Sequence, residues 1–390
     1  MLEVKTVGVF LEEPHLAVAA SAGRFAAERL AALPVAEDDG AARRQAREVL
    51  ALLGEAGLCR FVVPAAHGGA RERVDSLSLC VIRENLAQAS PLADAVFALQ
   101  GLGSMPIALA GTDEQKERWL PGVASGETMT AFAMTEPAAG SDVRAIETVA
   151  RREGDDYVLD GRKWLISNAG LADVYTTFAA VDSADGRDKP IACFLVAAEN
   201  PGLRFAGPQI LSAPHPLGEI VFEDCRVGAS ARLGDEDEGF KLGMRTLDRL
   251  RATVAAAACG MASRALDEAL AHAKERRQFG RALSEFQLVQ QKLALMATDL
   301  AAARLLTYRA AWEAENGDRV TLCSAMAKLA ATETAQRVID QAVQILGGRG
   351  VLASHPVDHL YRAVRALRIY EGTSEIQQLV IARELLAERG

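Results

Sequence analysis

The 390-residue sequence lacks paired cysteines and long apolar runs, and only 5% of it is aromatic. Its six cysteines are scattered without a C-x-x-C pair, so nothing indicates a zinc site or a redox dithiol, and we expect reduced core thiols. No run of about eighteen uncharged apolar residues occurs, and Glu3 and Lys5 interrupt the region where a signal peptide's apolar core would lie. These absences predict a cytoplasmic protein without a membrane span.

The charge balance argues against a nucleic-acid-binding protein. The net charge is −9 with a pI near 5.4, and no basic stripe stands out along the sequence. The length allows two or three domains and a large buried core. We therefore expect an acidic globular protein that does not bind nucleic acid.

The pattern of apolar and turn residues changes twice along the sequence. An Ala-rich helical pattern extends to about Leu120, short β-rich runs separated by turns follow to about Gly234, and helical periodicity then returns. This predicts a mainly α protein with three domains. We expect a helical N-terminal domain at 1–128, a small antiparallel, β-barrel-like middle domain at 129–236, and a C-terminal four-helix bundle at 237–390.

Local signals mark several helix ends. Thr112 with Gln115, and Ser284 with Gln287, each read as a capping box at a helix start. Gly280 is expected to stop the long helix that begins after Gly239, and Asn316-Gly317 to stop the next one.

The most informative motif is Ile369-Tyr370-Glu371-Gly372-Thr373-Ser374-Glu375. A carboxylate between an aromatic residue and a glycine can be shielded from water, and a desolvated carboxylate is a stronger base. Gly372 would let the backbone approach a ligand without a clashing Cβ. Alone, such a glutamate is also compatible with a helix start or a surface position.

A second motif supports a ligand site. Thr135-Glu136-Pro137-Ala138-Ala139-Gly140-Ser141-Asp142 places hydroxyls at both ends of a Pro/Gly turn with free backbone amides between them. Such a loop suits the polar edge of a flat heterocycle and an attached phosphate.

These two motifs, with the Gly-rich segment 344–350 and the basic turn 275–280, resemble the acyl-CoA dehydrogenase family over about Ala41 to Leu386. The resemblance implies bound FAD and an acyl-CoA thioester that is desaturated between its α and β carbons to the trans-2-enoyl-CoA. It further implies that electrons pass to an electron-transfer flavoprotein.

The resemblance assigns site residues in three groups. Glu371 matches the catalytic base, and Leu250 occupies the place where some family members carry that base instead. The cofactor-binding positions are Phe132, Met134, Thr135, Gly140, Ser141, Leu165, Ile166, Ser167, Arg276, Gln278, Phe279, Phe286, Gln287, Gln344, Gly347, Gly348, Thr373 and Glu375. The substrate-binding positions are Ser141, Asp248, Arg251 and Gly372. No metal site is expected.

In the family, the positions matched by the basic turn reach the FAD of a neighbouring subunit. The resemblance therefore implies at least a dimer, and by family habit a homotetramer built as a dimer of dimers. Three alternatives stay open: an acyl-carrier-protein-linked dehydrogenase, an acyl-CoA oxidase of the same family, and a flavin-free helical scaffold.

Other motifs are set aside on physical grounds. Gly348–Ala353 fits G-x-G-x-x-A, but an amphipathic helix rather than a strand precedes it, which argues against a dinucleotide fingerprint. His355 and His359 are separated by Pro356, which breaks the helix that would align them on a metal. His67 and His215 lie in Pro/Gly loops without the partners of a nucleophile.

Two features leave the substrate undefined. Asp94 is interpreted as a solvated helix residue, with a second acid near the pocket as the alternative. The loop Leu211–Gly218 lacks the Arg and the Ser or Thr cluster that many relatives carry near the CoA end of the substrate.

Overall fold

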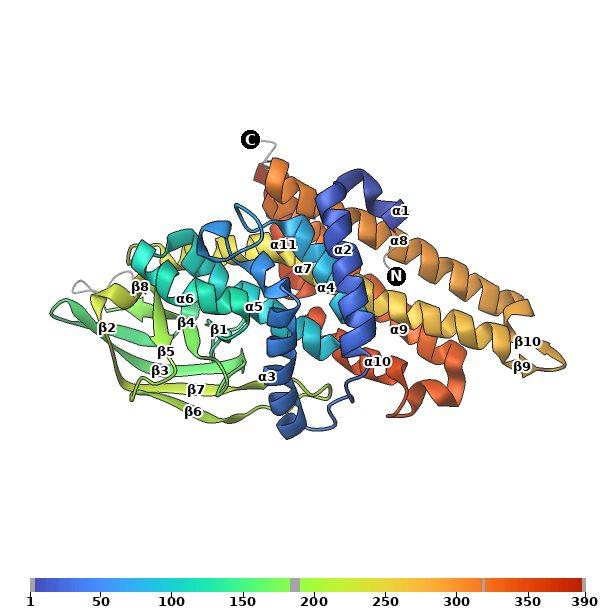
Figure 1. Cartoon of the computed structure of the whole chain (residues 1–390), viewed down its shortest axis with the longest axis horizontal. Coiled ribbons are helices and arrows are strands. Elements are labelled where there is room, and N and C mark those ends of the chain that lie inside the picture. The colour runs from blue at the N-terminus through green and yellow to red at the C-terminus, as the bar shows by residue number, and fades with distance from the viewer. Residues whose placement is uncertain (1–3, 183–189, 318–319, 388–390) are drawn as a thin grey trace. The chain divides into compact units, whose positions relative to one another are not determined.

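The computed structural model describes residues 4–182, 190–317 and 320–387. Its contacts divide the chain into two compact units (Figure 1). Unit 1 contains residues 1–33, 76–94 and 248–390, and unit 2 contains residues 34–75 and 95–247. The three predicted domain ranges are not separated by this division and stay a prediction.

Unit 1 is helical. Its elements are α1 (Val4–Val7), α2 (Glu13–Phe25), α4 (Ser76–Ala89), most of α7 (Gly239–Glu275), α8 (Gln287–Asn316), α9 (Val320–Leu346), α10 (Pro356–Leu367), α11 (Ser374–Ala387) and the short hairpin of β9 (Arg277–Gln278) and β10 (Arg281–Ala282). Small residues let these helices pack closely: a Cβ at Gly260 of α7 would lie 2.2 Å from the carbonyl oxygen of Glu84 in α4. The Ala-rich composition thus serves close helix packing.

Unit 2 combines helices with one eight-stranded sheet. The helices are α3 (Asp39–Glu55), α6 (Asp113–Ser125) and most of α5 (Pro91–Ala110). The strands are β1 (Thr130–Ala133), β2 (Val149–Glu153), β3 (Asp156–Ser167), β4 (Val174–Val181), β5 (Ile191–Ala197), β6 (Leu203–Pro208), β7 (Leu217–Val227) and β8 (Arg232–Leu233).

The sheet order is β6-β7-β3-β2-β4-β5-β8, and β1 also pairs with β4. The expected purely antiparallel sheet is wrong in one respect, because β1 and β2 both run parallel to β4. Every residue of β4 is buried, which explains why its sequence contains no charged residue, and Phe178, Phe194 and Phe222 are among the largest fully buried side chains.

The helix ends agree with the local sequence signals at some positions and differ at others. The Thr112 capping box is confirmed, with reciprocal hydrogen bonds of 2.8 and 3.3 Å to Gln115. The box at Ser284 is wrong, since Phe286 is the N-cap of α8 and makes no side-chain cap bond. The helix α7 ends at Glu275, before Gly280, because the chain turns there into the β9–β10 hairpin.

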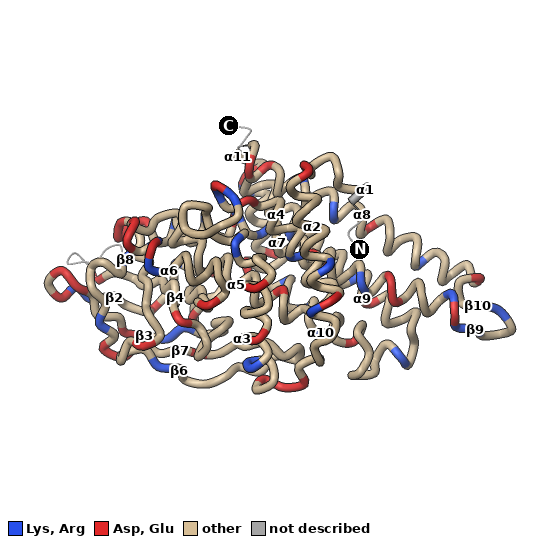
Figure 2. Tube along the Cα trace, in the orientation of Figure 1, with Lys and Arg blue, Asp and Glu red and all other residues tan. Residues whose placement is uncertain are grey.

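The predicted fold class is confirmed: the protein is mostly helical, with a central β domain followed by C-terminal helices. All six cysteines are free and buried, as expected. Figure 2 shows basic and acidic residues interspersed along the described chain. Among the described residues one helix, α5, is long and apolar enough to cross a membrane, but 78% of its most apolar window is buried, as in the core helix of a soluble protein.

Candidate active site

In unit 1, Glu371 lies in the turn between α10 and α11, in a left-handed conformation. Its φ is +53°, and Gly372 follows with φ +92°. A non-glycine residue in this region is strained by roughly 1–3 kcal/mol and persists only where the surroundings hold it, most often at functional sites. The turn ends at Thr373, whose Oγ1 accepts from the Ile376 amide at 3.3 Å, while Glu375 is exposed in the first turn of α11.

Three side chains from three helices hold this turn through its carbonyl oxygens. Lys328 of α9 donates from Nζ to the Gly372 oxygen at 2.6 Å. Gln377 of α11 donates from Nε2 to the same oxygen at 2.9 Å and to the Glu371 oxygen at 3.3 Å. Arg251 of α7 lies 3.4 Å from the Glu371 oxygen. Contacts from three side chains thus hold the strained conformation of Glu371 in place.

The carboxylate of Glu371 is left without a protein partner on one side. Its Oε2 is buried and has no hydrogen-bond partner within the described part of the chain. Burial raises the pKa of Glu371 above the ordinary glutamate value, while the charges of Arg83, Lys328 and Arg251 act against that rise. A desolvated carboxylate with one oxygen free of protein hydrogen bonds is what a general base requires.

Arg83, whose charge opposes the rise in the pKa of Glu371, is itself held by Asp94. Its Nε and NH2 lie 2.8 and 2.9 Å from the two carboxylate oxygens, and its NH1 donates to Thr253 at 2.8 Å. Asp94 is only 2% exposed, so the prediction of a solvated helix residue is wrong. The physical reason is charge pairing, because a buried carboxylate needs a bidentate cation of this kind.

Asp248 and Arg251, the predicted substrate-binding pair, contact each other. Arg251 forms a short ion pair with Asp248, and Asp248 also accepts from Thr321 at 2.9 Å. The Arg251 side chain is 6% exposed. The contacts of Arg251 with Asp248 and with the Glu371 carbonyl oxygen therefore help to hold the Glu371 turn.

In unit 2, the loop after β1 and the end of β3 lie together. The Trp164 amide donates to the Thr135 oxygen at 2.9 Å. Met134 is buried, Thr135 and Phe132 are half-buried, and Gly140 and Ser141 are exposed at the loop tip. A Cβ added at Gly140 would meet no atom of residues 4–182, 190–317 and 320–387 within 4 Å, so the space beside the loop tip is free of them.

The strand β3 carries a bulge between Lys163 and Ile166 that turns two apolar side chains outward. Leu165 has φ +54° and is 41% exposed, and Trp164 is 37% exposed. Ile166 is 1% exposed and belongs to the core, so only its backbone is available to a ligand. Ser167 ends the strand, and its Oγ lies 2.8 Å from His215 Nε2.

A buried ion pair fixes the loop to the strand. Lys163 Nζ lies 2.6 Å from Glu136 Oε1 and 3.1 Å from the Met134 oxygen. Glu136 also accepts from the amides of Glu147 and Thr148. Burial lowers the pKa of Lys163 to about 8, and the pKa of Glu136 is lowered by Lys163 against the effect of burial.

A third group of predicted residues lies at the end of the α8–α9 pair in unit 1. Phe279, at the tip of the β9–β10 hairpin, has φ +50° and is 94% exposed. Arg276, Gln278 and Gln287 are also exposed, and Arg281 stacks over the Phe286 ring at 4.0 Å.

The Gly-rich segment closes α9 at the same end, because α8 and α9 are consecutive antiparallel helices (Figure 1). Gln344, Gly347 and Gly348 are exposed, and Cβ atoms added at the two glycines would meet nothing within 4 Å in the part of the chain that the structure describes. Sixteen residues of α9 separate Lys328 from Gln344, which is about 24 Å along a helix. Within unit 1, these residues and Glu371 therefore do not form one compact site.

Sequence reasoning missed the residues that support the site. Lys328 could have been noticed, since it is the single charge in the otherwise uncharged stretch 320–332 of an apolar helix. Lys163 and Glu136 could not have been paired from the sequence, because they lie 27 positions apart. His355 and His359, set aside as ligands, have structural partners: His355 caps α10 through Val357, and His359 lies 2.9 Å from Arg362.

Comparison with known proteins links these features. Residues 12–127, 131–225 and 237–386 match the N-terminal, middle and C-terminal domains of acyl-CoA dehydrogenase. The chain is 38% identical to a 3-(aryl)acrylate reductase of Clostridium sporogenes, over 97% of this chain and 100% of that protein. It is 37% identical to a cyclohexane-1-carbonyl-CoA dehydrogenase of Geobacter metallireducens, over 93% and 95% of the two chains. The solved butyryl-CoA dehydrogenase of Megasphaera elsdenii superposes with a TM-score of 0.89 at 34% identity, covering 96% and 99% of the two chains.

Proposed function

Because the chain belongs to the acyl-CoA dehydrogenase family, we propose that it oxidises an acyl-CoA thioester to the trans-2-enoyl-CoA with Glu371 as the base. The family consists of FAD-dependent oxidoreductases that act on CH–CH groups. The observation that supports the proposal most strongly is the buried, unpartnered Oε2 of Glu371 in a strained turn held by three helices.

The chemistry divides between base and cofactor. Glu371 takes the proton from the carbon next to the thioester carbonyl, and the carbon–hydrogen bonding pair becomes the new double bond. Bound FAD supplies the acceptor for the hydride that leaves the neighbouring carbon. A carbon acid is weak, so a base with a raised pKa and a fixed position is required.

The residues present fit a flavin. We assign the loop positions Phe132, Met134, Thr135, Gly140 and Ser141 and the strand positions Leu165, Ile166 and Ser167 to flavin binding. The outward-facing Leu165 offers an apolar surface for a flat ring, and the open space at Gly140 accepts a ligand. We further assign Thr373 and Glu375 to flavin contacts beyond the base, and Ser141, Asp248, Arg251 and Gly372 to the thioester.

The remaining cofactor positions support an oligomer. We propose that Arg276, Gln278, Phe279, Phe286, Gln287, Gln344, Gly347 and Gly348 bind the pyrophosphate and adenosine of FAD held by a neighbouring subunit. The separation of about 24 Å along α9 between Lys328, which contacts the Glu371 turn, and Gln344 argues for this. The enzyme would then be a homotetramer built as a dimer of dimers.

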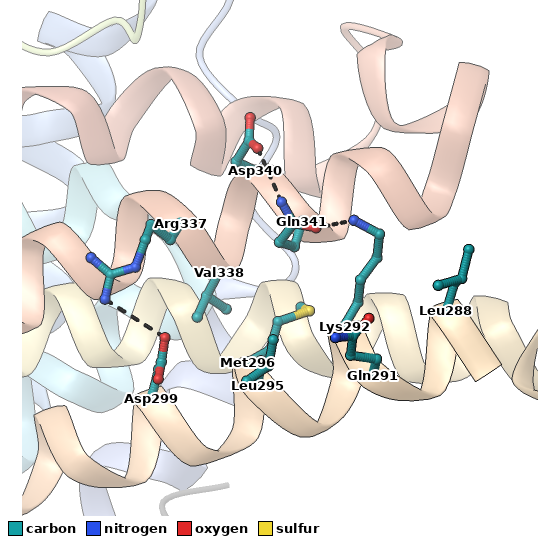
Figure 3. Close-up of a pocket in the computed structure, with 10 residues that line it drawn as sticks. All are labelled: Leu288, Gln291, Lys292, Leu295, Met296, Asp299, Arg337, Val338, Asp340 and Gln341. Atoms are coloured by element: carbon teal, nitrogen blue, oxygen red, sulfur yellow. Dashed lines mark hydrogen bonds and ion pairs between the residues drawn. The ribbon is translucent and has the colours of Figure 1, made fainter.

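A groove between α8 and α9 supports the same assembly. Its volume is about 570 Å³, and Figure 3 shows Leu288, Met296 and Val338 among its lining residues, with Lys292 bonded to Gln341. Leu288 and Leu295 are 74% and 57% exposed, which is more apolar surface than a solvated helix pair needs. We assign this groove to subunit contact.

One experiment tests the bound cofactor and the substrate class. We propose an electron-transfer flavoprotein as acceptor, a cytoplasmic location, and a CoA thioester as substrate. Purified protein should carry the yellow flavin absorbance and convert at least one thioester from a panel of straight, branched, cyclic and aryl acids with an artificial acceptor. Reaction only with a carrier-protein thioester, peroxide formation in air, or colourless protein that FAD cannot reconstitute would favour the carrier-linked enzyme, the oxidase or the scaffold respectively.

A further inference from the structure

His215 contacts the hydroxyl group of Ser167, a residue that we assign to flavin binding. The histidine lies between Pro214 and Pro216 in the loop that joins β6 to β7, and its Nε2 is 2.8 Å from Ser167 Oγ. Both residues belong to unit 2. Two flanking prolines restrict the backbone and so reduce the entropy lost in holding the imidazole in place.

Arg43 of α3 fixes the ends of both segments. Its NH1 donates to the Ala169 oxygen at 2.7 Å, just after Ser167, and its NH2 donates to the Leu217 oxygen at 2.8 Å, just after His215. Its Nε pairs with Asp39 at 2.7 Å. One guanidinium therefore sets the distance between the imidazole and the hydroxyl.

The imidazole is neutral at physiological pH. Burial and, after it, the positive charge of Arg43 lower the pKa of His215 to about 4, while Asp39 opposes the shift. A neutral imidazole carries one N–H, so one nitrogen donates and the other accepts.

The unpaired second nitrogen indicates which tautomer is present. Nδ1 is buried and has no partner among the described residues. A proton on Nδ1 would leave a buried N–H unpaired, which is rarer in proteins than an unpaired acceptor. A proton on Nε2 instead donates to Ser167 Oγ and leaves only a lone pair unsatisfied. Ser167 then accepts from His215, and its own hydrogen must point elsewhere.

We infer that His215 is a positioning residue that turns the Ser167 hydroxyl into a donor toward the polar edge of the flavin. The inference rests on the proposed placement of Ser167 at the cofactor. The histidine lies within the loop 211–218, between two prolines.

The test measures the flavin and not only turnover. Holoenzyme is prepared for Ser167→Ala, His215→Leu, His215→Gln and the double variant Ser167→Ala with His215→Leu. The flavin midpoint potential, the visible spectrum and the dissociation constant of FAD are recorded for each. His67→Leu serves as the matched control, since His67 lies in another loop of unit 2.

We expect Ser167→Ala and His215→Leu to shift the potential in the same direction and to weaken FAD binding by about 2- to 10-fold, the range of one hydrogen bond. The double variant should match Ser167→Ala alone, and His215→Gln, whose amide nitrogen can replace Nε2, should restore the wild-type values. His67→Leu should change nothing.

Two results would overturn the inference in distinguishable ways. A flavin potential that moves in Ser167→Ala but not in His215→Leu would leave the flavin placement intact and remove the role of His215. A potential and FAD affinity unchanged in Ser167→Ala would show that Ser167 does not face the flavin. If His215→Leu does not fold, His215→Gln and His215→Asn are compared instead, because the Asn side chain is too short to place its amide nitrogen where Nε2 lies. A wild-type flavin potential and FAD affinity in His215→Gln, with both altered in His215→Asn, would support the inference. Equal values in the two variants would overturn it.

Discussion

Lys328 Nζ lies 2.6 Å from the carbonyl oxygen of Gly372 and so joins the middle of α9 to the turn that carries Glu371. The side chain of Lys328 is fully buried, and burial lowers its pKa to about 8. This lysine has two effects on the base: it holds the turn, and its charge lowers the pKa of Glu371.

Replacing Lys328 by Met should therefore slow turnover by about 10- to 100-fold, because a small displacement of a catalytic group is enough for such a loss. The acid limb of the pH–rate profile should also move to higher pH, since removing a cation raises the pKa of Glu371. Gln377→Met is the matched control: it removes donors to the same carbonyl oxygen but no charge. Equal shifts of the acid limb in Lys328→Met and Gln377→Met would contradict the claim that the charge of Lys328 lowers the pKa of Glu371.

In the wild-type enzyme, activity should fall on the acid side at a pH above the value of an ordinary glutamate, about 4.3. The base acts only when ionised, and burial raises its folded-state pKa, so protonation begins at higher pH than in solvent. The dependence of kcat/KM on pH reports this group in the free enzyme. An acid limb at or below pH 4 would contradict the assignment.

Gly348→Ala should leave the fold unchanged but weaken FAD binding. Its added Cβ meets no atom of the described residues within 4 Å, so a ligand or a neighbouring subunit is what it would displace. Thermal unfolding of the apoprotein and FAD titration measure the two effects separately. Gly350→Ala gives the contrast, because its Cβ would lie 2.8 Å from the Val343 oxygen and should lower the Tm. Unaltered FAD affinity in Gly348→Ala would remove this segment from the cofactor site.

Lys163→Met should destabilise the protein by about 3–5 kcal/mol, because it leaves the buried carboxylate of Glu136 without its cation. Chemical denaturation of the apoprotein measures the loss. The double variant Lys163→Met with Glu136→Leu should recover part of it, since no buried charge then remains. A loss under 1 kcal/mol in the single variant would mean that solvent reaches the pair.

Much of this architecture follows from local pattern. The capping box at Thr112 could be predicted because it depends on residues only three positions apart. The parallel pairing of β1 with β4 could not be predicted, because it joins positions 44 residues apart and leaves no local signal.

The site follows the same rule. The motif around Glu371 could be read from the sequence, but the groups that tune it come from three distant helices, through Arg83, Arg251 and Lys328. Asp94 was misread because its partner Arg83 lies eleven residues earlier on another helix, out of reach of helical periodicity.

The central claim is that Glu371 removes the α-proton of a thioester that binds beside the flavin. It is tested most directly by mixing Glu371→Gln holoenzyme with a saturating reactive thioester under anaerobic conditions and following the loss of flavin absorbance in a single turnover. We predict that the variant binds FAD as tightly as the wild type but bleaches at least about 10²-fold more slowly, the usual contribution of a positioned base. Bleaching at the wild-type rate would contradict the account.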